Sequence, residues 1–323
     1  MKEIKYQLSN TAGFNSIMNY LQDYISEEYA MKEDATPEYL ICSCFGKSRL
    51  IEDTIRILYI GENLSPDFNI YDYVIGFDDI EFGDRYIRYP IYALAYREAF
   101  LAALEKHKVL ESELKKKDKF CSFVVSNGNE EDIRTQFFLK LNEYKRVESG
   151  GRFMNNIGYS LTGPNSKELF QRQCKFAIAF ENSSTPGYTT EKLLQAWHAG
   201  AIPIYWGNPE IAKEFNTKAF INCHEYKNFD AVIERIKEID NNDDLYMAMI
   251  REPILYEGSI AAKYVDMSYL KNFLDNIFGQ DKQCAFRRTS YFSRFGFDYA
   301  NQQIAENESV WSKVKKRICG GKV

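Results

Sequence analysis

The chain has 323 residues, of which 45% are hydrophobic, and a formal net charge of −5 at pH 7. This length and composition exclude a disordered tail and predict two globular domains. The negative net charge argues against a general nucleic-acid-binding protein, because neutralising phosphates requires a cationic surface. The seven cysteines are scattered, odd in number and without a C-x-x-C pair, so we expect reduced thiols and neither a disulfide framework nor a zinc site.

Residues 1–117 are predicted to form an N-terminal domain. Residues 1 to about 36 are polar and periodic, which favours helix and loop. A loop rich in turn residues covers Gly61–Asp67, and helical periodicity over Tyr92–Lys117 ends in the charged stretch Leu110–Lys119, which we interpret as a linker. Three apolar runs bounded by turn residues have the pattern of buried strands: Tyr39–Cys44, Ile55–Ile60 and Tyr73–Phe77.

Residues 118–283 are predicted to form a second domain in which strands and helices alternate. Such alternation predicts a parallel sheet covered by helices on both faces, with ligands at the carboxyl ends of the strands. The stretches Asn228–Leu255 and Ser268–Phe278 are predicted to be mainly helical. The predicted strands are Phe120–Ser126, Phe176–Phe180 and Ile202–Trp206, and the helices between them are Glu131–Tyr144 and Thr190–Ala199.

Residues 284–323 are predicted to be a helical segment that packs back on the N-terminal domain. In its last part, Val310–Val323, basic side chains alternate with apolar ones. That pattern fits a helix on an anionic membrane surface and a solvated, frayed terminus equally well. The sequence contains no apolar stretch near 18 residues and no signal-peptide core, so we expect a cytoplasmic protein whose membrane contact, if it has one, is peripheral on the inner membrane.

The densest group of polar residues lies in Phe180–Lys192. This run leaves an apolar strand and enters a helix that Thr189 or Thr190 can cap and that ends at Gly200. A helix N-terminus beside a strand end attracts anions, and Lys192 adds a full positive charge. The spacing therefore favours nucleotide binding over an ordinary capped helix. Further polar side chains that could contact ribose or phosphate are Glu181, Asn182, Tyr188 and Glu191.

Two polar residues outside this run have both a catalytic and a structural interpretation. Glu62 lies in a loop at a strand end, where it could remove a proton from an attacking hydroxyl, although most loop glutamates are only solvated. Arg134 begins a helix and could bind phosphate or form a surface ion pair. We find no Asp-x-Asp, H-x-x-x-H, G-x-G-x-x-G, P-loop or G-x-S-x-G motif, so the sequence does not favour metal-dependent, redox or serine-hydrolase chemistry.

The run Phe180–Pro209 resembles the donor-binding motif of the α-1,3/4-fucosyltransferases, the family 10 glycosyltransferases, and especially their bacterial members. The resemblance extends over residues 55 to about 225, with weaker continuity to about 280. Upstream segments similar to the family's N-domain signature are Tyr59–Asn63, Asp67–Tyr73, Phe77–Asp79, Asp84–Tyr86 and Arg88–Pro90. Intervening pieces that also match are Val125–Asn127, Ile133–Arg134 and Gly150–Gly151.

The resemblance implies an α/β fold of two facing Rossmann-like domains, the GT-B type. It implies an inverting enzyme that moves L-fucose from GDP-fucose to a GlcNAc or Glc hydroxyl of an N-acetyllactosamine- or lactose-type glycan, with α-1,3 or both α-1,3 and α-1,4 linkage. The N-terminal half would hold the acceptor and the C-terminal half the donor. Two alternatives stay open: a related transferase that uses another nucleotide sugar, and a catalytically silent glycan- or nucleotide-binding relative.

The resemblance also assigns roles to individual residues. Glu62 corresponds to the proposed general base, and Glu191 to the residue that holds the ribose. Metal is predicted to be dispensable and no cofactor is implied, because fixed protein donors would neutralise the leaving diphosphate. The implied diphosphate ligands are Arg134, Tyr188 and Lys192, the donor-site positions without an individual role are Glu181 and Asn182, and the further donor-site candidates are Ser126, Asn127, Gly150 and Tyr159.

Overall fold

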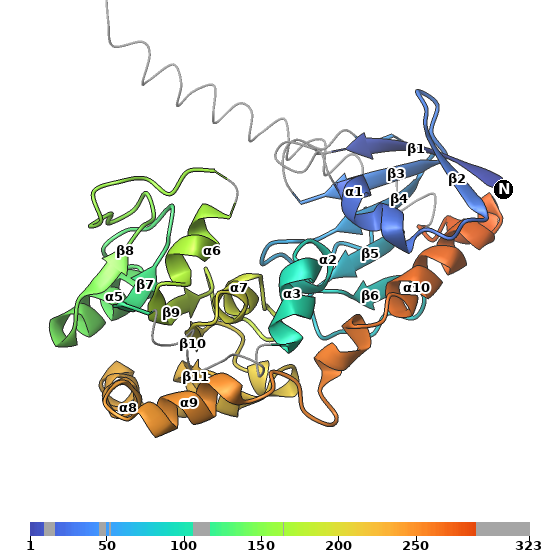
Figure 1. Cartoon of the computed structure of the whole chain (residues 1–323). Coiled ribbons are helices and arrows are strands. Elements are labelled where there is room, and N and C mark those ends of the chain that lie inside the picture. The colour runs from blue at the N-terminus through green and yellow to red at the C-terminus, as the bar shows by residue number, and fades with distance from the viewer. Residues whose placement is uncertain (10–16, 45–49, 52, 106–116, 164, 289–323) are drawn as a thin grey trace, which may run out of the picture. The chain divides into compact units, whose positions relative to one another are not determined.

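The computed structural model describes residues 1–9, 17–44, 50–51, 53–105, 117–163 and 165–288, which form two compact units (Figure 1). Unit 1 combines Met1–Tyr89 with the chain from Met267 onward, and unit 2 is Pro90–Asp266. This division differs from the predicted boundaries at 117 and 283. The reason is that α3 (Arg97–Leu104) packs on α7 (Lys192–His198) of unit 2, whereas α10 (Ser268–Gly279) packs on unit 1.

Unit 1 contains a six-stranded sheet in the order β2-β1-β3-β4-β5-β6, in which every neighbouring pair is parallel. The three predicted strands are confirmed. The prediction of helix and loop for residues 1 to about 36 is wrong for β1 and β2, whose side chains are mostly half-buried or exposed and therefore read as polar. The strands are β1 (Lys2–Ser9), β2 (Tyr29–Glu33), β3 (Tyr39–Ser43), β4 (Ile55–Tyr59), β5 (Tyr73–Gly76) and β6 (Tyr86–Arg88).

The C-terminal part of the described chain packs on this sheet. Lys2 Nζ donates to the carbonyl of Phe278 in α10 at 2.7 Å. Arg288 Nε donates to Asp72 Oδ2 at 2.9 Å, and both side chains are at most 1% exposed. The segment predicted to pack back on the N-terminal domain therefore does so up to Arg288, and the basic tail lies outside the described residues.

The short helices of the unit are α1 (Ile17–Leu21), η1 (Gln22–Tyr24) and α11 (Lys282–Ala285).

Unit 2 contains a five-stranded, all-parallel sheet in the order β11-β10-β9-β7-β8. The chain leaves β7 toward β8 on one side, then returns to β9 and continues to β10 on the other side. The carboxyl ends of β7 and β9 therefore form the switch point of the sheet, where open α/β sheets bind ligands. The strands are β7 (Lys119–Phe123), β8 (Val147–Ser149), β9 (Cys174–Phe180), β10 (Ile202–Trp206) and β11 (Ile221–Asn222).

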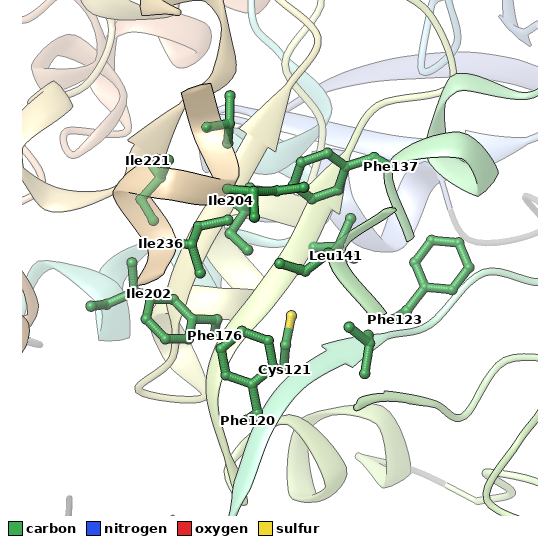
Figure 2. Close-up of a cluster of buried hydrophobic side chains, with 14 of the residues drawn as sticks. Phe120, Cys121, Phe123, Phe137, Leu141, Phe176, Ile202, Ile204, Ile221 and Ile236 are labelled. Atoms are coloured by element: carbon green, nitrogen blue, oxygen red, sulfur yellow. The ribbon is translucent and has the colours of Figure 1, made fainter. Parts of the chain in front are cut away.

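Helices cover the sheet of unit 2, and the predicted strand–helix alternation is confirmed. In Figure 2, Phe137 and Leu141 of α5 and Ile236 of α8 gather over Phe176 and Ile204 of the sheet, all of them fully buried. The helix predicted over Tyr92–Lys117 is interrupted after α2, and residues 106–116 lie outside the described part. The helices are α2 (Ile91–Leu94), α3, α5 (Ile133–Tyr144), α6 (Ser166–Gln171), α7 (Lys192–His198), α8 (Phe229–Asp240) and α9 (Asp243–Arg251), with one-turn helices η3 (Ile211–Lys213), η4 (Thr217–Ala219), η5 (Cys223–Glu225) and η6 (Ile260–Tyr264).

Two all-parallel α/β units agree with the predicted Rossmann-like architecture. The central strands of both sheets are buried, as parallel sheets require: every residue of β4 in unit 1 is buried, and so is every residue of β9 in unit 2 except Lys175. Within the described residues, no helix has the length and apolar character needed to cross a bilayer. The six cysteines that the structure describes are all free thiols.

Candidate functional site

A pocket lies at the switch point of the unit 2 sheet. Its walls come from the ends of two neighbouring strands and from the two helices that flank them. Two lysines are among the residues that line it, which favours an anionic ligand. The lining residues are Phe123, Val124, Val125, Ile178 and Phe180 from the strand ends, Lys167 and Gln171 from α6, and Lys192 from α7.

A buried carboxylate holds Lys192 at the edge of this pocket. Glu181, directly after β9, is 0% exposed. Its Oε2 accepts hydrogen bonds from Lys192 Nζ at 2.9 Å and from Thr190 Oγ1 at 2.6 Å, while its Oε1 accepts from the Thr190 backbone N–H at 2.7 Å. Burial raises the pKa of Glu181, and Lys192 opposes that shift. With its oxygens occupied in this way, Glu181 can act on a ligand only through Lys192.

This arrangement differs from the predicted capping of the helix. The cap position of α7 is Glu191, and no side chain caps the helix there. Thr190 donates its N–H and its hydroxyl to Glu181, and the Thr189 hydroxyl donates to Glu214 Oε1 at 3.0 Å. The prediction that Thr189 or Thr190 caps α7 is therefore wrong, because both hydroxyls donate to carboxylates and the cap position is Glu191.

The loop between β9 and α7 is fixed by the segment that follows β10. Asn208 is 1% exposed, accepts from the Gly187 N–H at 2.9 Å and donates to Thr189 Oγ1 at 3.1 Å. Gly207 packs so closely on Glu181 that a Cβ there would lie 2.3 Å from Glu181 Cγ. A side chain at position 207 would displace the carboxylate, so the glycine is required by the site's geometry.

Arg134 lies on the opposite side of the switch point, in the first turn of α5. Its Nε donates to both carboxylate oxygens of Asp132 at 2.9 Å, and its Nη2 also donates to that carboxylate. Its Nη1 donates to Asn182 Oδ1 at 2.9 Å and its Nη2 to the Asn127 carbonyl at 3.2 Å. The structure thus brings together Arg134, Asn127 and Asn182, which the sequence predicted separately, and adds Asp132 as their support.

Glu191 lies at the start of α7, between two lysines. Lys192 Nζ is 3.8 Å from Glu191 Oε1, and Lys167 is close enough to act on the carboxylate electrostatically. Burial would raise the pKa of Glu191, but the two lysines leave it below its ordinary value. Glu191 is therefore ionised at neutral pH and can accept hydrogen bonds from ligand hydroxyls.

The remaining donor-site candidates differ in how well the structure places them. The Gly150 N–H donates to the Phe123 carbonyl at 3.0 Å, so the turn after β8 lies against the end of β7. Ser126 is exposed just beyond that strand end, and Tyr188 is 2% exposed in the loop before α7. Tyr159 is 54% exposed, and its assignment to the donor site stays a prediction.

Glu62 belongs to unit 1. It is partly exposed and follows β4 by three residues, at the carboxyl edge of the sheet. The thiol of Cys44, after the neighbouring strand β3, interacts with the backbone N–H groups of Gly61 and Glu62. Burial raises the pKa of that thiol. The loop that carries Glu62 is thus tied to the adjacent strand end, whereas all the donor-site candidates belong to unit 2.

Metal ligands are not clustered in the part of the chain that the structure describes. No group of three or more His, Cys, Asp or Glu side chains there has a geometry that could hold a metal ion. The independence from metal that the sequence suggested stays a prediction, to be tested in solution.

Comparison with known proteins identifies the family. Residues 6–96 match the family model of the alpha-(1,3)-fucosyltransferase FucT N-terminal domain, and residues 114–251 match that of the glycosyltransferase family 10 (fucosyltransferase) C-terminal region. The chain aligns with a crystal structure of an alpha1,3-fucosyltransferase with GDP-fucose at 30% identity and a TM-score of 0.71, covering 87% of this chain and 92% of that one. The chain therefore belongs to glycosyltransferase family 10, and its fold is that of this family.

Relatives in sequence agree with this assignment. The alpha-(1,3)-fucosyltransferase FucT of Helicobacter pylori is 35% identical over 295 residues, which cover 80% of this chain and 60% of that protein. A putative fucosyltransferase of Acanthamoeba polyphaga mimivirus is 32% identical over 62% of this chain and 34% of its own length. The chain thus spans 60% or less of the length of these two relatives.

Several residues that line the pocket or hold its surroundings in place were not predicted from the sequence. Asp132 and Glu214 matter only through the side chains they hold, which sequence spacing does not reveal. Asn208 lies inside the motif, and an asparagine directly after the required Gly207 was a usable signal. Lys167 comes from α6, ahead of the motif, and only tertiary packing brings it to the pocket.

Proposed function

We propose that this chain is an inverting α-1,3-fucosyltransferase that transfers L-fucose from GDP-fucose to a GlcNAc or Glc hydroxyl of an N-acetyllactosamine- or lactose-type glycan. The observation that carries the proposal is the cationic pocket at the switch point of the unit 2 sheet, in a chain of a family with a solved structure containing GDP-fucose. Family membership supports the reaction class, and the contacts of individual side chains support the roles below.

The diphosphate would be neutralised by protein groups from both sides of the switch point. Lys192 supplies a full charge at the pocket and is kept in place by Glu181 at 2.9 Å. Arg134 supplies a planar donor group that Asp132 and Asn182 already hold in one orientation. Such preorganised donors stabilise the charge that grows on GDP as the fucosyl bond breaks, because they need little rearrangement during the reaction.

Glu191 would bind the ribose of the donor. The carboxylate is ionised, 19% exposed and next to the pocket lysines. An ionised carboxylate can accept a hydrogen bond from each of two neighbouring hydroxyl groups. Glu191 therefore suits the 2′- and 3′-hydroxyls of a nucleotide better than it suits a phosphate.

Glu62 would act as the general base. The acceptor hydroxyl loses its proton to the carboxylate while its oxygen forms a bond to the anomeric carbon of fucose, and the bond from that carbon to the diphosphate oxygen breaks with its electron pair going to GDP. Attack from the face opposite the leaving group inverts the configuration. The position of Glu62 in a loop at the carboxyl edge of the unit 1 sheet suits this role.

A transfer assay tests the proposal. Purified protein is incubated with GDP-fucose and a panel of acceptors (lactose, type 1 and type 2 N-acetyllactosamine and their sialylated forms), and products are identified by mass and linkage analysis. We expect fucosylated type 2 acceptor or lactose with α-1,3 linkage. GDP-mannose and UDP-galactose serve as control donors, and transfer from one of them but not from GDP-fucose would favour another nucleotide sugar. Binding of GDP without transfer to any acceptor would favour a catalytically silent relative.

A further inference from the structure

Lys167 is a pocket residue without a role in the reaction as proposed so far. It lies in α6, next to α7, and lines the same pocket as Lys192. Its Nζ donates to Gln195 Oε1 at 2.6 Å, which ties the side chain to α7. Burial lowers the pKa of its ammonium group, and Glu191 opposes that shift. Lys167 is only partly exposed, and such a lysine keeps its charge most readily beside an anionic group.

Because Lys167 Nζ is bonded to Gln195, the ammonium group lies on the same face of α7 as Glu191, which precedes Gln195 by four residues. The Gln195 backbone N–H donates to the Glu191 carbonyl at 2.8 Å, and residues four apart lie above one another on a helix. Glu191 opposes the lowering of the Lys167 pKa, and Lys167, together with Lys192, lowers the pKa of Glu191.

One lysine does not neutralise the two carboxylates of this cluster. Glu181 and Glu191 repel each other, and Lys192 lies closer to the first, at 2.9 Å, than to the second, at 3.8 Å. Two carboxylates in one partly buried cluster disfavour each other's ionised form, and each cation beside them offsets this effect. Lys167 is the second cation of this cluster, and it acts from a different helix.

The pocket also contains an acceptor that suits hydroxyl groups. Gln171 is 3% exposed, and its Oε1 has no hydrogen-bond partner within the described residues. A buried acceptor without a partner is costly unless a ligand donates to it. Ribose hydroxyls are donors of this kind, whereas a diphosphate at neutral pH offers no comparable donor.

We propose that Lys167 is a positioning residue for Glu191: it keeps the carboxylate ionised and fixed beside α7, so that the carboxylate accepts hydrogen bonds from the ribose hydroxyls of the donor nucleotide. This inference rests on the proposed function, in which Glu191 is the ribose ligand. It gives α6 a role in recognising the nucleotide. The two pocket lysines then have different roles: Lys192 binds the diphosphate, and Lys167 positions the carboxylate that binds the ribose.

The test compares the binding of GDP and of 2′-deoxy-GDP by titration calorimetry. Wild-type protein should prefer GDP by roughly tenfold or more, because the 2′-hydroxyl of GDP can donate a hydrogen bond to a charged acceptor and 2′-deoxy-GDP lacks that hydroxyl. In Lys167→Met the affinity for GDP should fall by about fivefold while that for 2′-deoxy-GDP changes little, so that a tenfold preference falls to about twofold. Lys167→Arg should restore most of the preference.

A matched control comes from the same unit. Lys175 of β9 is 20% exposed, and its Nζ donates to Asp240 Oδ1 at 2.8 Å, away from the lining of the pocket. Lys175→Met should lower the thermal stability and leave the preference between the nucleotides unchanged. Should Lys167→Met fail to fold, Gln195→Leu carries the test, because it removes the tether, keeps every charge and should reduce the preference by about threefold.

The pH dependence gives a second readout. The charged groups that face Glu191 are Lys192 on α7, Lys167 on α6 and Glu181 at the end of β9. Because the pKa of Glu191 is lowered, wild-type protein should keep its preference for GDP as pH falls from 7 to about 5. Lys167→Met raises that pKa, so its remaining preference should disappear at a higher pH. The diphosphates of the two nucleotides titrate alike, so their affinity ratio reports on the ribose contact.

The possible results separate this inference from the proposed function. Wild-type protein that binds neither nucleotide contradicts the proposed function itself. Wild-type protein that prefers GDP, together with a Lys167→Met variant that keeps this preference at every pH, overturns only the role of Lys167. An equal loss of affinity for both nucleotides in Lys167→Met would show that Lys167 contacts the diphosphate, and that also overturns the inference.

Discussion

The two units have related sheets, but their candidate sites are built differently. In unit 2 the switch point lies between β7 and β9, and the side chains around it form a dense hydrogen-bonded network with a buried carboxylate at its centre. In unit 1 the corresponding switch point lies between β1 and β3, and Glu62 follows β4, one strand further along. The proposed donor site is thus preorganised by the fold, whereas the proposed base depends on a loop at a strand end.

This difference predicts that variants in the two units will have different effects. Changes at the unit 2 network should alter the binding of the nucleotide, because its groups hold charge in place before any chemistry occurs. Changes at Glu62 should alter the rate of transfer and leave nucleotide binding intact, because a general base acts only when the acceptor proton moves.

The largest effect is expected for Glu62→Gln. Replacing the carboxylate by an isosteric amide removes the base, so the rate of transfer should fall by roughly a thousandfold. The affinity for GDP should stay within about twofold of the wild-type value, because Glu62 belongs to unit 1 and the nucleotide site to unit 2. Transfer rate and calorimetric affinity are measured on the same preparation.

Glu81→Gln is the control for this prediction, since Glu81 is an exposed glutamate in another loop of unit 1. It should retain full activity. If Glu62→Gln retained most of its transfer activity, or if it lost GDP binding in proportion to the rate, the assignment of Glu62 as base would be wrong.

The next largest effect is expected for Lys192→Met, which should weaken GDP binding by about a hundredfold because a charge-assisted contact to the diphosphate is lost. The same change leaves the carboxylate of Glu181 buried without its cation, which should cost about 3 kcal/mol of unfolding free energy. The double variant Lys192→Met/Glu181→Gln should recover most of the stability and none of the affinity. Recovery of affinity in the double variant would contradict a direct role for Lys192 and point to misplacement of the loop. Chemical denaturation and calorimetry give the two quantities.

A smaller loss of GDP affinity, about tenfold, is expected for Arg134→Ala. Arg134 is held by Asp132 and Asn182, so removing it takes away one preorganised donor group and leaves the network around Glu181 intact. Arg146 is a suitable control, because it is 64% exposed and pairs with Glu148 in β8. Arg146→Ala should bind GDP as the wild type does. Unchanged affinity in Arg134→Ala, measured by calorimetry, would exclude Arg134 from the diphosphate site.

The comparison also shows why the sequence predicted one site better than the other. Most of the unit 2 network lies within the continuous run from Phe180 to Asn208, so strand, loop, helix and next strand could be recognised together. The contribution of Lys167 could not be predicted, because α6 reaches the pocket only through tertiary packing. The strands β1 and β2 were missed for a different reason: β1 is fully buried only at Ile4 and at Ser9, and β2 has no fully buried side chain, which leaves little apolar pattern.

The last prediction concerns metal and expects no effect. In the proposed donor site, Lys192 is held by Glu181 and Arg134 by Asp132, and these fixed cations can neutralise the leaving diphosphate, a task that a divalent cation performs in other enzymes. Transfer measured after dialysis against EDTA should therefore equal transfer in the presence of manganese or magnesium. A complete loss in EDTA that manganese restores would mean that these side chains do not suffice, and it would shift the neutralising role from the preorganised network of unit 2 to an ion.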